Sequence, residues 1–148
     1  MQDKINGLKS KLILNIDTKE ALVLEKKLQY RHVNELYQDA GKGETLVAER
    51  YAQVESQIDS LGEEVRCPLC RQNAEKLLSE LKSELPGLES QLSTKHEETE
   101  WLSQRLFDIE MAINDLETEI HQAIRHNKQI EVEICFLQAQ EQLQAVIT

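Results

Sequence analysis

Glycine, proline and aromatic residues are scarce in this chain of 148 residues, which has five Gly, two Pro, one Trp, three Tyr and two Phe. A globular domain usually needs more aromatic residues for its core and more Gly and Pro for its turns. Charged residues, in contrast, make up 30% of the chain. This composition is typical of long helices and coiled coils. We therefore predict an all-α fold whose core is a seam between helices.

Long apolar runs are also missing. No stretch approaches the roughly 18 to 20 consecutive apolar residues of a membrane span. The N-terminus has no charged segment followed by an apolar core, as a signal peptide would. Three cysteines, one of them isolated at Cys135, do not suggest a secreted disulfide scaffold. We expect no membrane contact and an intracellular location, cytoplasmic in a bacterium or nuclear in a eukaryote.

Basic residues are in the minority, because 17 Lys and Arg face 27 Asp and Glu, for a formal net charge of -10. So acidic a surface repels phosphate backbones, which disfavours direct nucleic-acid contact by these helices. The stretch from Gly41 to Thr45 resembles a phosphate loop only superficially, since it lacks the Gly-X-X-X-X-Gly-Lys-Ser/Thr pattern. We expect no enzymatic activity from this chain, and a protein as its partner.

What the second half of the chain has in abundance is a heptad repeat. Leu or Ile fills most of its a and d positions, and this pattern predicts a coiled-coil strand. The a positions are Leu78, Leu85, Leu92, Thr99, Leu106, Ile113, Ile120, Asn127, Ile134 and Glu141. The d positions are Leu81, Leu88, Lys95, Leu102, Ile109, Leu116, Ala123, Ile130, Leu137 and Gln144.

The repeat changes near the C-terminus, where Glu141 and Gln144 occupy seam positions. A neighbouring apolar stripe keeps the same spacing out of step with the seam, and it predicts that the buried face widens or rotates there. The stripe consists of Val132, Phe136, Ala139, Leu143 and Val146.

The first half of the chain also predicts helix. Apolar residues recur at helical spacing from Val47 to Val65, and an earlier stripe starts at Ile5 and becomes ambiguous between Leu22 and Tyr37. Two glycines and a threonine predict a helix break near 39–45. In the second half, Pro86-Gly87 predicts a kink or a one-turn break. The arms begin and end within helical patterns, so we expect a fragment of a larger protein, with Met1 supplied for expression.

A Cys-X-X-Cys motif, Cys67-Pro68-Leu69-Cys70, separates the two helical halves. We predict an ascending arm at 1–66, a turn at 67–70 and a descending arm at 71–148, which together form an antiparallel coiled-coil hairpin. Residues that face each other across such a hairpin have numbers that add up to about 137, the sum of 67 and 70. Gly41 to Gly43 would then face residues 94 to 96.

The two thiols of this motif are candidate zinc ligands. Thiolates separated by two residues can hold Zn²⁺ from one tight turn, which Pro68 would stiffen. A thioredoxin-like redox pair is the first alternative, but it needs a strand before the motif, and the sequence shows no strand alternation. The second alternative is that the cysteines are incidental.

A tetrahedral zinc site needs two more ligands. The histidines are His32, His96, His121 and His126, and even the nearest in the predicted register, His96, lies 26 residues from the turn. Cys135 falls at the far end of the hairpin. We therefore predict one Zn²⁺ shared with a second copy of the chain, each copy donating Cys67 and Cys70.

The neighbours of the cysteines fit such a shared site. Four thiolates and one Zn²⁺ carry a net charge of -2, and two copies would bring Arg66 and Arg71 twice to that charge. Either arginine could equally be a solvated residue at a helix end. Leu69 would be free to pack against its counterpart in the second copy.

Cys67-Pro68-Leu69-Cys70 between heptad arms resembles the zinc hook of SMC-like DNA-repair ATPases of the SbcC type. The resemblance implies a long antiparallel coiled coil projecting from an ATPase head, with Cys67 and Cys70 as ligands of a zinc shared by two molecules. It also implies a nuclease partner in DNA processing. Many hooks have Gly after the second cysteine, where this chain has Arg71. Other hook-bearing ATPases include anticodon nucleases and anti-phage defence systems.

Three further residues have specific expectations. Asn127 occupies a seam position, where it would either fix the register by hydrogen bonding or be a tolerated polar defect. We expect Trp101 to pack beside Leu102 and Cys135 to be a partly buried, inert thiol. The cysteines and the heptad arms predict a zinc-dependent homodimerisation module, and the resemblance implies that it belongs to an SMC-like ATPase in DNA repair or processing. The alternatives are a self-standing coiled-coil adaptor and the hook of an anti-phage defence ATPase.

Overall fold

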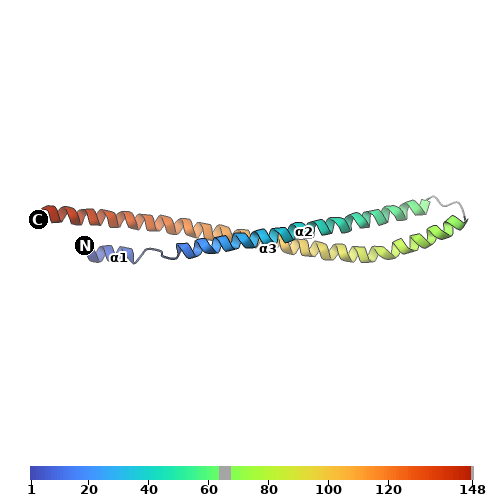
Figure 1. The fold of residues 1–148 in the computed structure, drawn as a ribbon, viewed down its shortest axis with the longest axis horizontal. Coiled ribbons are helices and arrows are strands. Elements are labelled where there is room, and N and C mark those ends of the chain that lie inside the picture. The colour runs from blue at the N-terminus through green and yellow to red at the C-terminus, as the bar shows by residue number, and fades with distance from the viewer. Residues whose placement is uncertain (64–67, 148) are drawn as a thin grey trace. The chain divides into compact units, whose positions relative to one another are not determined.

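Three helices make up the structure, a computed structural model that describes the backbone of residues 1–63 and 68–147 and the side chains of 1–61 and 72–147. Helix α1 spans Gln2–Lys9, α2 spans Ile16–Glu63 and α3 spans Pro68–Ile147 (Figure 1). The described residues include no strand, which confirms the all-α class. None of the described helices is both long and apolar enough to cross a membrane.

The chain divides into two compact units. Unit 1 contains Met1–Tyr30 and Asp108–Thr148, and unit 2 contains Arg31–Phe107. Unit 1 therefore holds α1, the start of α2 and the end of α3, whereas unit 2 holds the rest of α2 and α3. Within each unit, contacts join an N-terminal segment to a segment of α3.

The predicted seam of α3 is confirmed from Leu78 to Leu137. Every a and d position in this range is buried or half-buried, and almost every other position is exposed. Glu141 and Gln144 are exposed, as is the whole of α3 after Leu137 as far as Ile147. Leucine and isoleucine at 3/4 spacing thus bury one narrow stripe of this helix, as a coiled-coil pattern predicts.

The buried positions of α2 are regularly spaced in the structure, although its apolar residues are irregularly spaced in the sequence. Most of its buried and half-buried positions repeat every seven residues in two series. They are Ile16, Val23, Tyr30, Tyr37, Glu44, Tyr51 and Ile58, and Lys19, Lys26, Val33, Ala40, Val47, Val54 and Leu61. Several leucines lie outside this seam, with Leu24 66% and Leu28 64% exposed. The pattern looked ambiguous because lysines occupy seam positions while leucines lie on the surface.

The predicted helix break at 39–45 is wrong, because α2 continues through these residues. Neither Gly41 nor Gly43 adopts a positive φ, and the hydroxyl of Thr45 donates a hydrogen bond to the carbonyl of Gly41 at 2.9 Å. Each glycine costs a helix about 1 kcal/mol relative to alanine. Burial of Ala40 and Val47 on the same helix offsets this cost.

Helix α3 also continues through Pro86, without a one-turn break. Proline removes one backbone donor and crowds the preceding turn, which commonly bends a helix. Figure 1 shows α3 curving in this part of unit 2. Leu85 and Leu88 keep their seam positions on either side of the proline and pack in the same cluster.

A real break lies where the sequence pattern predicted none, between α1 and α2 at residues 10–15. The side chain of Asn127 in α3 clamps this segment: its Oδ1 accepts a hydrogen bond from Ile13 N at 2.8 Å, and its Nδ2 donates one to Ile13 O at 2.8 Å. His126 Nε2 lies 3.1 Å from Lys11 O. The polar seam residue Asn127 thus satisfies backbone groups that the helix break leaves unpaired.

Two other side-chain expectations need correction. Trp101 is 63% exposed, and its ring lies 5.8 Å from the guanidinium carbon of Arg105 rather than packing beside the seam. Cys135 is exposed rather than partly buried, because it follows the seam residue Ile134 by one position. The core is only one seam wide, so a residue one position away from a seam position can already be exposed.

Candidate functional site

The Cys-X-X-Cys motif lies where α2 and α3 come together in the chain. Helix α2 ends at Glu63 and α3 begins at Pro68. Proline is favoured at the first position of a helix, where its missing N–H leaves no bond unmade. Cys70 is therefore the third residue of α3, in the first turn of an 80-residue helix.

Part of the motif lies outside the described residues. Arg66 and Cys67 belong to the segment that the structure does not describe, and only the backbone is described for Pro68, Leu69, Cys70 and Arg71.

Helices α2 and α3 contact each other along unit 2 beside this motif. A hydrophobic cluster forms around Val54, Leu81 and Leu88, and Val54 is fully buried. The partly buried residues packed against the cluster are Val47, Tyr51, Ile58, Leu61 and Leu85. This cluster fixes the two helices against each other close to the motif.

Polar contacts flank the cluster and show the direction of the two helices. Arg50 holds Glu84 with two hydrogen bonds, from Nε to Oε1 at 3.1 Å and from Nη2 to Oε2 at 3.0 Å. Farther from the motif, Glu44 contacts His96. Because a lower number on α2 pairs with a higher number on α3, the two helices run in opposite directions in unit 2.

The same direction holds in unit 1, where Lys11 contacts His126 and Lys19 pairs with Glu119 at 3.4 Å. These partners lie within one residue of the register predicted from a chain reversal at the cysteines, and Arg50 and Glu44 lie within one helical turn of it. Lys27 departs from this register by two turns, with its Nζ 3.3 Å from Glu117 Oε1.

His96 links α2 to α3 through Nδ1 and contacts Glu100 of its own helix through Nε2. Nδ1 lies 2.9 Å from Glu44 Oε1, and Nε2 lies 3.0 Å from Glu100 Oε1. Both nitrogens can donate only when the imidazole is protonated. The hydrogen bond with Glu44, together with the charges of Glu100 and Glu44, raises the pKa of His96 above its ordinary value of 6.5.

The pH dependence of this link has a definite sign. Folding raises the pKa of His96, so protonated His96 stabilises the folded chain. This contribution to the free energy of unfolding is complete below about pH 6.5 and is lost as the pH rises through the higher pKa of the folded state. We expect NMR titration to place the His96 pKa above 6.5, and Glu44→Gln to lower it. The control is Glu131→Gln, the same change on an exposed residue of unit 1. An unchanged His96 pKa in Glu44→Gln would contradict the link.

Tyr51 makes a second polar contact beside His96. Its hydroxyl donates a hydrogen bond to Glu89 Oε1 at 3.0 Å. Hydrogen bonding to Glu55 and then to Glu89 raises the pKa of Tyr51 to about 12. Tyr51 therefore stays a neutral donor that connects α2 to α3 over the whole physiological pH range.

Among the side chains that the structure describes, no three His, Cys, Asp or Glu are grouped so that they could hold a metal ion. His96 is 26 residues beyond Cys70 on the same continuous helix, or about 39 Å along its axis at 1.5 Å per residue. His32 also belongs to unit 2, where its side chain is exposed, and His121, His126 and Cys135 belong to unit 1.

Comparison of the chain with protein-family models, curated proteins and solved structures found no match. The residues themselves must therefore support any functional conclusion.

Three connections had no clear signal in the sequence pattern. They are the Arg50–Glu84 pair, the His96 link and the clamp between Asn127 and Ile13. The predicted register brought Glu44 close to His96, but nothing in the spacing distinguished this histidine from an exposed one. Asn127 was visible as a polar seam residue, whereas its backbone partner depended on a helix break that the pattern did not predict.

Proposed function

We propose that this chain is a zinc-dependent homodimerisation module, an antiparallel coiled-coil hairpin that holds Cys67 and Cys70 at its turn. One observation carries the proposal: the Cys-X-X-Cys motif joins two helices that pack against each other in opposite directions in unit 2. In such an arrangement the thiols lie at the end of a pair of helices, where a second molecule can approach them.

The second copy follows from the ligand count. Zinc in a structural site takes four ligands, and the motif supplies two. His96, 26 residues beyond Cys70 on α3, is already bonded to two carboxylates. Two copies that each donate Cys67 and Cys70 would complete a Cys₄ set. When bound, Zn²⁺ would supply four bonds that tie the two turns together.

The surrounding residues would assist as well. The guanidinium groups of Arg66 and Arg71 would offset the negative charge of four thiolates. Leu69 would pack against its counterpart. Because these residues form only a small contact, metal binding would supply much of the affinity between the two copies.

The parent protein that we propose is an SMC-like ATPase of DNA repair or DNA processing, with a nuclease partner. The resemblance of Cys67-Pro68-Leu69-Cys70 between heptad arms to the hook of that family supports this assignment. Two zinc-linked copies would tether two ATPase heads, and whatever those heads hold. A hook-bearing anti-phage defence ATPase is the alternative parent, and the hook residues would do the same work there.

One experiment separates this function from its competitors: the mass in solution and the zinc content of the purified chain are measured together, before and after chelation. We expect a dimer that holds one Zn²⁺ per two chains and that chelation dissociates. A zinc-free chain with a Cys67–Cys70 disulfide would indicate a redox switch. Dimerisation through the helices that is equally tight with and without zinc would indicate a coiled-coil adaptor.

A further inference from the structure

The apolar stripe near the C-terminus of α3 lies on the surface. Val132 and Phe136 are each 62% exposed, Leu143 is 63% exposed and Val146 is 84% exposed, and Ala139 is exposed as well. We refer to these five residues as the C-terminal stripe. The sequence predicted that the buried face would widen or rotate toward them, and this expectation is wrong for the single chain.

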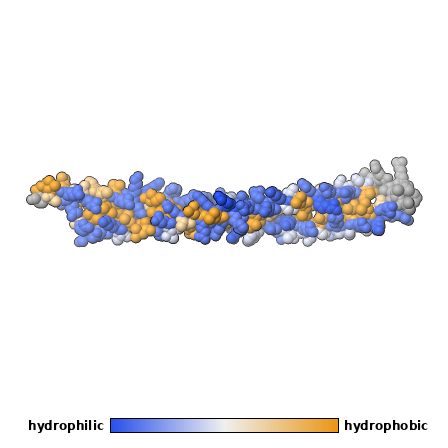
Figure 2. Space-filling view, in the orientation of Figure 1, coloured by the Kyte–Doolittle hydropathy of each residue, from blue (hydrophilic) through white to orange (hydrophobic). Residues whose placement is uncertain are grey.

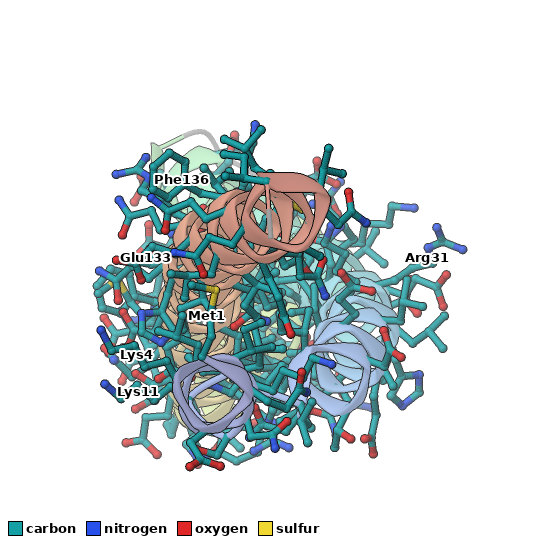
Figure 3. The ribbon with its side chains drawn as sticks, turned by 90° about the vertical axis from the view of Figure 1, so that its left-hand side faces the viewer. Met1, Lys4, Lys11, Arg31, Glu133 and Phe136 are labelled. Carbon is teal, nitrogen blue, oxygen red and sulfur yellow. The ribbon has the colours of Figure 1, made fainter. Side chains whose placement is uncertain are left out.

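The C-terminal stripe lies on the outer face of α3. The inner face of this segment, Ile130, Ile134 and Leu137, packs in one cluster with Ile5, Leu8 and Leu12. Each stripe residue follows a seam position by two residues, so the stripe occupies heptad positions c and f, which face away from the partner helix in a two-stranded coil. Figure 3 shows Phe136 projecting to the side of α3 rather than toward α1.

These outer positions are polar in the preceding part of unit 1. From residue 108 to 129, Met111 is the only apolar member of the c and f series. The other members are Asp108, Asp115, Thr118, Gln122, Arg125 and Gln129. Figure 2 shows hydrophobic surface gathered at the end of the molecule where α3 ends. The apolar outer face is therefore a local feature, 15 residues or about 22 Å long.

The charged residues beside the stripe are complementary to those of a second copy of this chain. Taking Phe136 as position a of a second heptad, Lys128 falls at g and Glu133 at e, and both side chains are exposed. In a parallel pair of helices, residue g of one copy faces residue e of the next heptad in the other. Lys128 of each copy would then face Glu133 of the other copy. Figure 3 shows Glu133 on the same side of α3 as Phe136.

The rest of the stripe does not oppose self-association. Glu141 is the only charged residue from 134 to 148, and it falls at position f of the second heptad, opposite the stripe. Gln140 and Gln142 flank the stripe at e and g. Although the chain carries a net charge of -10, a second copy meets no like charge along this face.

We propose that the C-terminal stripe is a self-association face on which a second copy of this chain docks in parallel. An antiparallel copy would lose the two Lys128–Glu133 pairs, since e then faces e and g faces g. The contact is shorter than a standard protein interface and is therefore weak by itself. It is independent of the proposed zinc site, because it uses the other end of α3.

The test uses the full chain with Cys67→Ser and Cys70→Ser, in reducing buffer with chelator, so that the proposed zinc contact cannot contribute. Sedimentation equilibrium over a concentration series should show a monomer–dimer equilibrium. Phe136→Glu with Leu143→Glu should weaken the dimer about tenfold or more. Phe107→Glu is the matched control, since Phe107 is 56% exposed in unit 2 and should leave the dimer unchanged.

A charge exchange tests the orientation. Lys128→Glu should weaken the dimer, because it places two glutamates opposite each other, and adding Glu133→Lys should restore it. Circular dichroism would verify that each variant keeps its helicity. A chain that stays monomeric at all concentrations would overturn the proposal, as would a dimer that tolerates both glutamates on the stripe. Failure of the exchanged charges to restore the dimer would overturn the parallel arrangement.

Discussion

Replacing Cys67 and Cys70 together with serine should abolish zinc binding and zinc-dependent dimers while leaving the helices intact. Serine removes the thiolates that hold zinc but keeps the approximate size of the side chains. Helicity should persist because the hydrophobic cluster of unit 2 centres on Val54, Leu81 and Leu88. Mass in solution, zinc content and circular dichroism would be measured on the same samples.

Cys135→Ser is the control for this experiment. Cys135 is an exposed thiol of unit 1 and has no place in the proposed site. Its replacement should leave the zinc content and the zinc-dependent dimer unchanged. A double variant of Cys67 and Cys70 that still dimerises in a zinc-dependent manner as tightly as the natural chain would refute the proposed function.

Truncation of Leu81 to alanine should destabilise unit 2 by about 2 to 4 kcal/mol. Leu81 is 7% exposed and belongs to the cluster with Val54 and Leu88, so the shorter side chain leaves a cavity between α2 and α3. Urea denaturation would be followed by circular dichroism in the chain with Cys67→Ser and Cys70→Ser. It would report the loss of free energy of unfolding without a contribution from zinc.

Leu77→Ala provides a matched comparison, because Leu77 lies one turn earlier on the same helix. Its side chain is 46% exposed and lies outside the cluster. Its truncation should change the free energy of unfolding by only about 0.5 kcal/mol. Equal losses from Leu77→Ala and Leu81→Ala would mean that burial along the seam does not govern the stability of unit 2.

The sequence predicted α3 well because its seam is chemically uniform. Leucine and isoleucine recur at one phase, so the buried stripe could be located from spacing alone. In α2 the same phase contains Lys19, Lys26 and Glu44, all half-buried. Long charged side chains can bury their stems while their charged ends reach water. Spacing of apolar residues therefore could not reveal this seam.

The helix breaks show the limit of local propensity. Gly41 and Gly43 suggested a break and Pro86 a possible one, yet α2 and α3 continue there. Packing on both sides outweighs a cost of about 1 kcal/mol per glycine and about 3 kcal/mol for the proline. The break at residues 10–15 depends instead on Asn127, 114 positions away from Ile13. No local pattern carries that information.

The candidate zinc site stays a prediction from the chemistry of its residues. Two cysteines at the junction of two helical halves were enough to suggest half of a metal site. The link through His96 and the exposure of the C-terminal stripe required side-chain positions. An apolar stripe at 3/4 spacing looks the same in the sequence whether it faces a partner within the chain or the solvent.

Unit 1 contains two antiparallel segments, α1 with the start of α2 and the end of α3. The break at residues 10–15 makes them respond differently to tension. Residues 10–12 form a turn and a bend, whereas six fully extended residues span up to about 20 Å. A pull along the segment containing α1 and α2 could therefore lengthen it at residues 10–15 once the hydrogen bonds of Asn127 to Ile13 open. The facing part of α3 is unbroken and has no such reserve of length. A load shared by both segments would reach its first yielding point at this amide clamp.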